Sequence, residues 1–415
     1  MKDKIAIVVQ RYGPEINGGA ELHAKLLAEK LSSLYEVEVL TTCAIEYEFW
    51  DNHYSEGTES VNGIKVRRFK TLKKDLKKFN KLSKTVRNIY KYGNRKLTPL
   101  NFAYLLYKRK EYNKKRFNFN EWLEAQGPFS VDLIHFIKEE KENYKAFIFF
   151  TYLYHPANMG IREVADKSIL IPTAHDEPQF YLEGYKTIFS LPKFIIYNTQ
   201  TEKDLVEQVY PQTKRINSEI AGIGFDDYDT SIGKLPDYLS AGKYFVYVGR
   251  IVEDKGCAMM IGYFRDFKRD HPEYRDIKLV LAGKNALDEK ITQGEDIILM
   301  GFVDHDLKNT LLIHAAALIM PSFYESLSLI TLEAMLMKVP VIVNRNCEVL
   351  HHHIEKSKTG KSFAGSTEFS EALLFYLTRT LDASAAEGNR AKNYVLGNYS
   401  WDSVINTFNS AVKTL

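Results

Sequence analysis

Short apolar runs alternate with amphipathic helical stretches along almost the whole chain. Apolar runs of about 4–8 residues between turn signals are typical of buried strands, and their alternation with helices indicates parallel β-α-β units. The sequence therefore predicts an α/β fold with parallel sheets, and 415 residues suffice for two domains. The expected strands are residues 5–10, 37–41, 64–68, 146–150, 169–173, 194–197, 218–223, 244–248, 278–282, 297–300, 318–320 and 341–343.

A turn-rich stretch from Gly224 to Gly242 separates the first seven expected strands from the last five. We therefore expect two Rossmann-like domains with a cleft between them. The sequence shows no internal repeat and no low-complexity tract.

Cysteine content and apolar run lengths indicate the compartment. Cys43, Cys257 and Cys347 are odd in number and widely spaced, so they supply neither a disulfide framework nor a zinc spacing. The apolar run Ile5–Val9 is too short for a signal peptide, and Ala146–Tyr154 is far shorter than the ~20 residues of a membrane span. We expect a protein of the reducing cytoplasm that does not cross a membrane.

Positive charge is concentrated in residues 65–116. This segment holds 20 lysines and arginines against two acidic residues, a local charge of +18 in a chain of net charge +3. Apolar residues between Leu72 and Ile89 recur at three- and four-residue steps, which predicts an amphipathic helix with a lysine-rich face. Residues 100–110 add aromatic side chains beside cations. The segment suits an anionic membrane surface or polyanionic partner, or it packs on its own domain and leaves a solvated basic face.

Two glutamates flank a predicted strand-to-helix turn within Pro321–Met335. N–H groups at the helix start and the positive end of the helix dipole form an anion site that suits a diphosphate. Glu333 would lie roughly 9 Å further along the helix, where a carboxylate can accept hydrogen bonds from ribose hydroxyls. Glu325, on the turn, would face the group that the diphosphate carries. The N–H groups are those of Ser326, Leu327, Ser328 and Leu329.

Two cations follow the expected strand 244–248. Gly249 and Arg250 end that strand, and Lys255 precedes the next helix. Arg250 and Lys255 would lie at the carboxyl ends of parallel strands, the edge where open α/β sheets bind ligands. Taken singly, each is equally compatible with a solvated loop charge.

Two adjacent glycines, Gly18 and Gly19, lie between the first expected strand and the helix that follows it. Glycines at a helix start let a ligand approach the backbone closely, whereas a plain tight turn needs only one. The G-x-G-x-x-G spacing of a dinucleotide fingerprint is absent. We therefore expect a ligand contact of another kind.

Together these segments resemble glycosyltransferase family 4, retaining enzymes with the GT-B fold, in which two Rossmann-like domains face each other across a cleft. The resemblance covers nearly the whole chain. It implies an acceptor-side domain of residues 1–225, completed by a C-terminal helix over 399–415, and a nucleotide-sugar-binding domain of residues 226–398. The segments that carry it are residues 18–21, 173–176, 248–250, 255–256, 301–303, 325–333 and 399–402.

The resemblance implies transfer of a hexose from a UDP- or GDP-sugar to an acceptor hydroxyl with retention of configuration. Arg250 and Lys255 would hold the diphosphate, whose departure is the main barrier. Glu325 would contact the donor sugar, and His175, at the carboxyl end of a strand, would lie beside the reacting carbon. These four are the implied catalytic residues. The implied donor-binding residues are Gly18, Gly19, Gly249, Phe302, Val303, Ser326, Leu327, Ser328, Leu329 and Glu333, with Glu333 on the ribose and the 302–303 backbone on the base.

Three positions depart from the family pattern. Lys338 stands two residues before a proline, where the family usually has glycine. Residues 346–348 lack the usual glycine pair before the glutamate, and Ser326 replaces a common glycine. These departures concern the expected pocket of the donor sugar.

Two further motifs compete as metal signals. Asp304-His305-Asp306 matches the D-x-D pattern of metal-dependent sugar transferases, but it begins a helix, where N-capping by Asp304 is the better explanation. The adjacent histidines 351–353 point in different directions on one element, which favours a surface or core-edge role. We therefore expect no metal and no cofactor besides the donor.

The basic segment lies in the expected acceptor-side domain. We therefore expect a glycan or polyprenyl-linked glycan acceptor, as in bacterial surface polysaccharide (lipopolysaccharide or capsule) biosynthesis, and peripheral contact of residues 65–116 with anionic lipid at the inner face of the cell membrane. No groove-reading motif indicates nucleic acid. Two alternatives share the fold: a sugar-nucleotide epimerase or hydrolase, and a non-catalytic scaffold.

Overall fold

The computed structural model describes residues 2–16, 18–93, 117–227, 233–292 and 294–415. The chain divides into two compact units, each with its own sheet. The first unit comprises Met1–Ile223 and Asp402–Leu415, and the second comprises Gly224–Trp401. Residues 100–110 of the basic segment lie outside the described residues.

The first unit is built on an eight-stranded sheet in the order β3-β4-β2-β1-β5-β6-β7-β8. Its strands are β1 Lys4–Val8, β2 Glu36–Thr42, β3 Gly57–Val61, β4 Ile64–Phe69, β5 Ala146–Phe150, β6 Ser168–Ile171, β7 Phe194–Tyr197 and β8 Asn217–Ile220. Its α-helices are α1 Gly19–Leu31, α2 Leu76–Gly93, α4 Phe119–Gln126, α5 Val131–Glu140, α6 His155–Glu163, α7 Gln200–Val209 and the last helix, α15 Trp401–Lys413. Short 3₁₀ helices are η1 Lys141–Asn143, η2 Ala165–Lys167, η3 Pro178–Tyr181, η4 Glu183–Lys186 and η5 Pro211–Arg215.

The edge strand β3 is an exception to parallel pairing. It pairs antiparallel with β4 across Asn62-Gly63, whose φ values are 49° and 79°. Two positive φ values at Asn-Gly are those of a type I′ hairpin turn. The expected strands pair in parallel, and β3 is an additional antiparallel edge strand that the sequence analysis missed, although Asn-Gly is the signal that predicts its hairpin.

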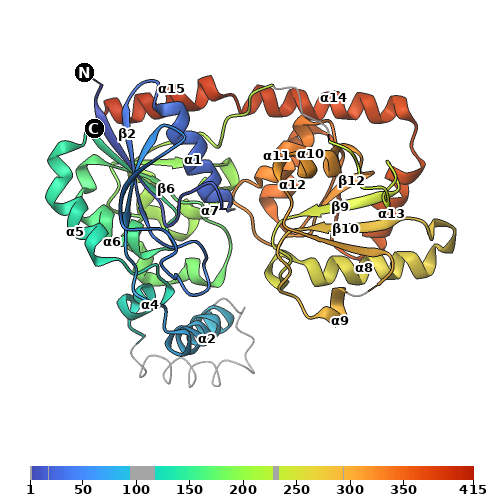
Figure 1. Ribbon diagram of the computed structural model, residues 1–415, viewed down its shortest axis with the longest axis horizontal. Helices are drawn as coiled ribbons and strands as arrows, with labels where there is room; N and C mark the ends of the chain where they lie inside the picture. The colour runs from blue at the N-terminus through green and yellow to red at the C-terminus, as the bar shows by residue number, and fades with distance from the viewer. Residues whose placement is uncertain (1, 17, 94–116, 228–232, 293) are drawn as a thin grey trace. The chain divides into compact units, whose positions relative to one another are not determined.

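The second unit is built on a parallel six-stranded sheet in the order β11-β10-β9-β12-β13-β14. Helix α8 lies on one side of this sheet, and α10, α11 and α12 lie on the other (Figure 1). The strands are β9 Tyr244–Val248, β10 Lys278–Ala282, β11 Ile297–Gly301, β12 Ala317–Met320, β13 Val341–Asn344 and β14 Lys361–Phe363. The helices are η6 Glu253–Lys255, α8 Cys257–Asp270, η7 Pro272–Tyr274, α9 Glu289–Thr292, α10 His305–Ile313, α11 Leu329–Leu336, α12 Glu348–Ser357, α13 Ser366–Thr378 and α14 Leu381–Asn398.

Strand order places the candidate site residues. In each sheet the order reverses beside the first strand of the unit, between β1 and β5 and between β9 and β12. Loops that leave such a switch point at the carboxyl ends of the strands are where open α/β sheets bind ligands. Arg250 follows β9 and Glu325 follows β12, whereas Gly18 and Gly19 follow β1.

The apolar stripe of α2 faces its own unit. Val86 is only 1% exposed within the hydrophobic core, and Phe79 and Leu82 pack against that core. The Phe79 ring stacks on Trp122 with centroids 5.7 Å apart. The described side chains of α2 therefore agree with the interpretation in which the apolar stripe packs on its own domain and the basic face remains exposed.

None of the helices in the described part of the chain combines the length and the apolar character needed to cross a membrane.

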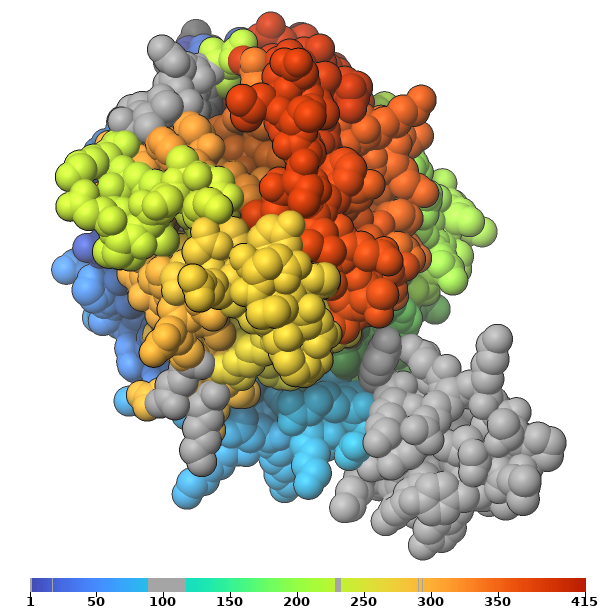
Figure 2. All heavy atoms as spheres, turned by 90° about the vertical axis from the view of Figure 1, so that its right-hand side faces the viewer, coloured from blue at the N-terminus to red at the C-terminus, as the bar shows by residue number. Residues whose placement is uncertain are grey.

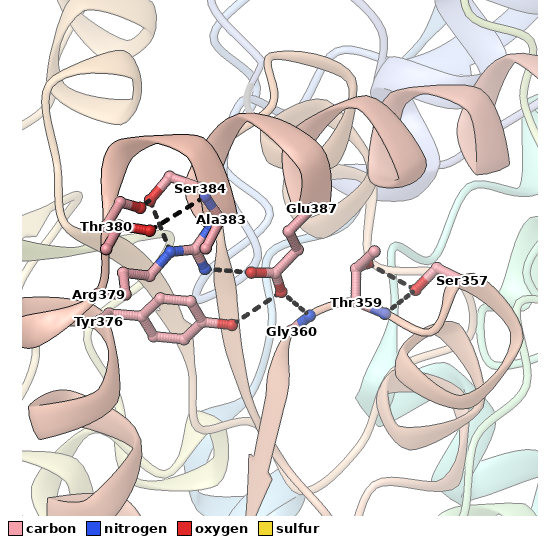
Figure 3. A network of polar contacts seen from close by, with 9 residues as sticks. All are labelled: Ser357, Thr359, Gly360, Tyr376, Arg379, Thr380, Ala383, Ser384 and Glu387. Atoms are coloured by element: carbon pink, nitrogen blue, oxygen red, sulfur yellow. Dashed lines mark hydrogen bonds and ion pairs between the residues drawn. The ribbon is translucent and has the colours of Figure 1, made fainter.

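A buried carboxylate anchors the beginning of α14 (Figure 3). Glu387 accepts hydrogen bonds from the Gly360 N–H and the Tyr376 hydroxyl, and it pairs with Arg379. These partners lie at the start of β14 and at the end of α13, so one side chain connects three elements. Figure 2 shows the resulting layer of α13 and α14, in orange-red, beside the yellow segment that contains α8.

Candidate functional site

The second unit brings Lys255 and Glu325 together. Lys255 Nζ lies 2.7 Å from Glu325 Oε1 and 3.4 Å from the Tyr324 carbonyl oxygen. The two charged side chains are 29% and 14% exposed, so water reaches them. Residues 70 positions apart in the sequence therefore meet at the edge between β9 and β12.

Glycines allow this edge to close around the two loops. Gly256 has φ +70°, and a Cβ there would lie 2.3 Å from the Pro321 carbonyl oxygen. Likewise, a Cβ on Gly283 would lie 1.9 Å from the oxygen of Gly249. Both positions need glycine, because the backbone of the neighbouring loop occupies the space of a side chain. Arg250, beside Gly249, is exposed at the same edge.

The loop between Glu325 and α11 has the geometry of an anion site. Ser328, the N-cap of α11, adopts the left-handed conformation with φ 64° and ψ 73°. The first backbone bonds of this helix run from Thr331 and Leu332 to the Ser328 oxygen. The N–H groups of Ser328, Leu329 and Ile330 precede those bonds, and N–H groups at this position lack an intrahelical acceptor. Two of these three belong to the predicted set of residues 326–329, and Ile330 extends it because α11 begins at Leu329.

Glu333 lies nearer to this loop than predicted. Because α11 begins at Leu329, Glu333 is one turn into the helix, roughly 6 Å along it rather than roughly 9 Å. Its Oε2 lies 2.6 Å from Lys308 Nζ of α10, and both side chains are largely buried. Lys308 was not predicted as a site residue, because the pair exists only once α10 and α11 pack on one face of the sheet.

The predicted base-binding residues lie at the end of β11. Gly301, at φ +65°, closes the strand, and its oxygen accepts the Gly283 N–H at 2.7 Å. Phe302 is 71% exposed and Val303 is partly buried. An exposed aromatic ring at the carboxyl edge of the sheet is available to a planar base.

In the first unit the two adjacent glycines differ. A Cβ on Gly18 would lie 2.1 Å from Glu21 Oε2 and 2.8 Å from the Tyr47 hydroxyl. A Cβ on Gly19 would meet no atom within 4 Å. The fold of this unit therefore explains why position 18 is glycine, and it leaves position 19 without a packing reason for glycine.

A buried polar cluster underlies this glycine loop. Glu21 Oε1 accepts hydrogen bonds from Gln10, from Arg11 and from the Tyr47 hydroxyl, at 2.7–3.0 Å. The Arg11 guanidinium also lies 3.4 Å from the centre of the Tyr47 ring. Glu21 and Arg11 are 2% and 4% exposed, so this is an internal ion pair that fixes the start of α1. The sequence prediction included none of these contacts.

His175 lies in the loop after β6, one strand away from the switch point of the first sheet. Its Nδ1 is 3.6 Å from Glu177 Oε1, which accepts a hydrogen bond from the Tyr152 hydroxyl at 2.8 Å. The loop is attached to α7 because the Ala174 N–H donates to Glu202 at 2.6 Å. Burial raises the pKa of Glu202 to about 8, although backbone N–H groups oppose this shift.

The two metal signals have structural explanations. Asp304 caps α10 by accepting the Leu307 N–H at 2.8 Å, which confirms the N-cap prediction. His351 pairs with Glu355 on its own helix, and His353 is buried against Leu327 and Tyr394. Within the described part of the chain, no group of three or more His, Cys, Asp or Glu side chains has the arrangement of a metal site.

Lys338 shows why its position usually holds glycine. Its φ is +63°, in the left-handed region that glycine adopts without strain. A Cβ on Gly388 of α14 would lie 2.7 Å from the Lys338 Cβ. Gly388 therefore leaves the space that the Lys338 side chain needs, although the Lys338 backbone is in a conformation that favours glycine.

The chain resembles known glycosyltransferases in sequence. Residues 242–379, within the second unit, match the family described as glycosyl transferases group 1. Over 99% of its length the chain is 23% identical to an uncharacterized glycosyltransferase, MJ1607, of Methanocaldococcus jannaschii, and it covers 99% of that relative.

Solved structures share the fold across the whole chain. The E. coli trehalose-6-phosphate structure bound with UDP-2-fluoro glucose aligns with a TM-score of 0.68 and 12% identity over 99% of both chains. Sucrose-phosphate synthase from Thermosynechococcus elongatus aligns with a TM-score of 0.67 and 14% identity, over 100% of this chain and 99% of that one. These likenesses show the GT-B fold, and the family match lies within the second unit.

Proposed function

We propose that this chain is a glycosyltransferase that moves a sugar from a nucleoside-diphosphate sugar to an acceptor hydroxyl with retention of configuration, as its resemblance to family 4 implies. The observation that carries the proposal is the edge between β9 and β12. There the Lys255–Glu325 pair, Arg250 and the N-terminal loop of α11 belong to one switch point. The UDP-2-fluoro glucose named for the E. coli structure supports a nucleotide-sugar donor.

The proposed roles follow from charge and position. The N–H groups of residues 328–330 and the cations of Arg250 and Lys255 would stabilise the negative charge that develops on the departing diphosphate. Glu325 keeps the Lys255 ammonium at the loop and faces the donor sugar. Glu333, held by Lys308, would accept hydrogen bonds from the ribose hydroxyls.

The reaction needs no covalent intermediate on the protein. The bond between the anomeric carbon and the diphosphate oxygen breaks, and the acceptor oxygen bonds to the same face of that carbon. The acceptor proton passes to the departing diphosphate. We propose that Gly19 approaches the phosphates and that His175 lies beside the reacting carbon. We also propose that the donor binds without a metal ion.

The acceptor is proposed to be anionic. Exposed lysines of α2 project from the first unit, and Figure 2 shows α2, in light blue, at the surface. Helix α2 packs against η3, which directly follows the His175 loop. We favour a polyprenyl-diphosphate glycan of surface polysaccharide assembly. A soluble sugar phosphate is the second candidate, since two aligned structures carry sugar phosphates in their names.

Product analysis tests the reaction class. The purified chain is incubated with labelled UDP- and GDP-sugars, with and without glycan or polyprenyl-linked acceptors, in EDTA. The proposal predicts acceptor-dependent transfer that EDTA leaves intact. Epimerised or free sugar at the same rate without acceptor would indicate the epimerase or hydrolase alternative, and complete loss of activity in EDTA would contradict the metal-free mechanism.

Liposome co-sedimentation distinguishes the two acceptors. The variant to test changes exposed lysines only: Lys73, Lys77, Lys81 and Lys84 are exposed, whereas Lys74 packs 3.6 Å from the centre of the Phe79 ring and is left unchanged. Changing these four exposed lysines to Glu should abolish binding to anionic vesicles, because each engaged cation contributes about 1 kcal/mol of binding free energy. Binding of the wild type should weaken with salt. No binding by the wild type would favour the soluble sugar phosphate.

A further inference from the structure

One histidine of the 351–353 run contacts the loop that precedes α11. His353 lies on α12, is 1% exposed, and its Nε2 is 2.8 Å from the Leu327 carbonyl oxygen. Its Nδ1 is 2.9 Å from the Tyr394 hydroxyl of α14. Because a carbonyl oxygen only accepts, Nε2 carries the proton and Nδ1 accepts from Tyr394. Burial lowers the pKa of His353 to about 4, so the ring stays neutral near pH 7.

This contact sets the direction of a backbone N–H. The peptide unit between Leu327 and Ser328 is planar and trans, so its C=O and N–H point in opposite directions. A hydrogen bond that holds the Leu327 oxygen toward α12 therefore turns the Ser328 N–H away from α12. That N–H is the first of the group that precedes the intrahelical bonds of α11.

The same contact supports an unfavourable conformation. Ser328 has φ 64°, which costs a non-glycine residue free energy and persists only where neighbouring contacts determine it. The Ser328 hydroxyl bonds to Thr331 at 2.9 Å, and His353 fixes the preceding peptide. The loop thus has one restraint on each side of the strained residue.

The other partner of His353 is itself anchored. Tyr394 is seven residues, two turns, after Glu387, so both lie on one face of α14. Glu387 is the carboxylate that binds Gly360, Tyr376 and Arg379 (Figure 3). Helix α14 packs against both α11 and α12. His353 therefore connects the loop to a helix that packs against both α11 and α12.

We infer that His353 is a positioning residue of the diphosphate site, whose Nε2–H orients the Leu327–Ser328 peptide so that the Ser328 N–H faces the donor phosphates. This inference rests on the proposed function, since it assumes that a nucleoside diphosphate binds at the start of α11. It gives His353 a role that is neither metal binding nor solvation at the surface.

Two variants separate the two hydrogen bonds of His353. Gln places its amide N–H near the position of Nε2, so His353→Gln keeps the bond to Leu327 and loses Tyr394. Asn reaches only the position of Nδ1, so His353→Asn keeps Tyr394 and loses Leu327. Each variant loses one buried hydrogen bond, and a purely structural role would lower the thermal stability of both without separating their nucleotide affinities. His351→Ala, on the same helix, is the matched control.

The measurement is calorimetric titration with whichever of UDP, GDP and ADP the wild type binds. We expect His353→Gln and His351→Ala to bind within about 3-fold of the wild type, and His353→Asn to bind roughly 10-fold more weakly. Ser328→Gly should restore several-fold of the lost affinity in the His353→Asn background, because glycine adopts positive φ without strain.

Equal affinities of the Gln and Asn variants, or no rescue by Ser328→Gly, would overturn the inference while leaving the proposed function intact. If the wild type binds none of the three nucleotides, the proposed function fails and the inference fails with it. Should His353→Asn not fold, His353→Met replaces it. Met fills the site without making either hydrogen bond, so this variant should bind roughly 10-fold more weakly than His353→Gln. Equal affinities of the Met and Gln variants would overturn the inference.

Discussion

The two units share one strand order at their switch points but differ in the chemistry of those edges. Between β9 and β12, charged side chains are partly exposed and paired across elements, as in Lys255–Glu325. Beside β1, the charged side chains are buried under a glycine loop, as in Arg11–Glu21. The fold supplies the place for a ligand in both units. We propose that the exposed pair between β9 and β12 meets the diphosphate, whereas the buried pair beside β1 fixes the glycine loop.

The largest expected effect is at the exposed pair. Lys255→Ala removes a cation from the proposed diphosphate site and leaves Glu325 without its partner, so we expect turnover to fall by roughly 10²-fold or more. Steady-state transfer assays provide the measurement. Lys243→Ala is the control, since Lys243 pairs with Asp276 at the opposite end of β9 and should keep full activity. Near-normal turnover of Lys255→Ala would contradict a catalytic role for the edge between β9 and β12.

Two buried glutamates of the first unit should respond to pH in opposite directions. Glu38, bound by Lys4, Arg67 and the Tyr144 hydroxyl, has a pKa lowered from 4.5 to about 2 by these partners against the effect of burial. Because its pKa is lower in the folded state, the ionised Glu38 stabilises the fold above about pH 4.5, and this stabilisation is lost as pH falls toward 2. The free energy of unfolding should change by about 3 kcal/mol over this range. The stability advantage of the wild type over Glu38→Gln should therefore shrink between pH 5 and pH 3.

Glu202 should show the reverse dependence. Its folded pKa is raised to about 8 by burial, so its contribution is complete below about pH 4.5 and is lost as pH rises through 8. Glu202→Gln should gain stability relative to the wild type between pH 6 and pH 9. Thermal unfolding of the wild type and of both variants is measured between pH 3 and pH 5 for Glu38 and between pH 6 and pH 9 for Glu202, and a variant whose stability changes with pH in parallel with the wild type would contradict its assignment.

The adjacent glycines separate a folding role from a ligand role. Gly18→Ala places a Cβ against the buried Glu21, so we expect a loss of about 1–3 kcal/mol in stability. Gly19→Ala meets open space within its unit, and we expect unchanged or slightly higher stability with roughly 10-fold lower activity. Thermal unfolding and transfer assays on both variants provide the comparison. Full activity of Gly19→Ala would remove Gly19 from the proposed donor site.

The smallest expected effect is at Lys338. Lys338→Gly removes the strain of a left-handed backbone conformation but adds the entropy cost of glycine in the unfolded chain. We therefore expect the free energy of unfolding to rise by about 0.5 kcal/mol. Lys356→Gly, inside α12, should instead lose about 1 kcal/mol. A destabilised Lys338→Gly would indicate that the lysine side chain makes a contact worth more than the strain.

Sequence patterns predicted the parts of the molecule that depend on local chemistry. Apolar runs located every central strand, and Asp304 was identifiable as an N-cap from its position before a helix. The short edge strand β14 and the hairpin strand β3 escaped because they are exposed or short, and burial patterns carry little information there. The Asn62-Gly63 turn would have revealed β3.

Contacts between distant elements could not be predicted in the same way. The pairs Lys308–Glu333 and Arg11–Glu21 form only when helices and loops pack, and single charged residues in a sequence look like solvated surface. Among the missed residues, Glu202 had a local signal, because Thr199-x-x-Glu202 is a capping box before a helix. His353 had none, since adjacent histidines do not reveal which ring is buried.

Nucleotide titration in EDTA tests the central claim most directly. Calorimetry of the wild type with UDP, GDP and ADP should show binding of at least one nucleoside diphosphate without metal, because cations and backbone N–H groups supply the positive charge. The same nucleotide should bind Lys255→Ala at least 10-fold more weakly and Lys243→Ala with wild-type affinity. Absence of binding by the wild type, or equal affinity in Lys255→Ala, would contradict a diphosphate site at the edge between β9 and β12.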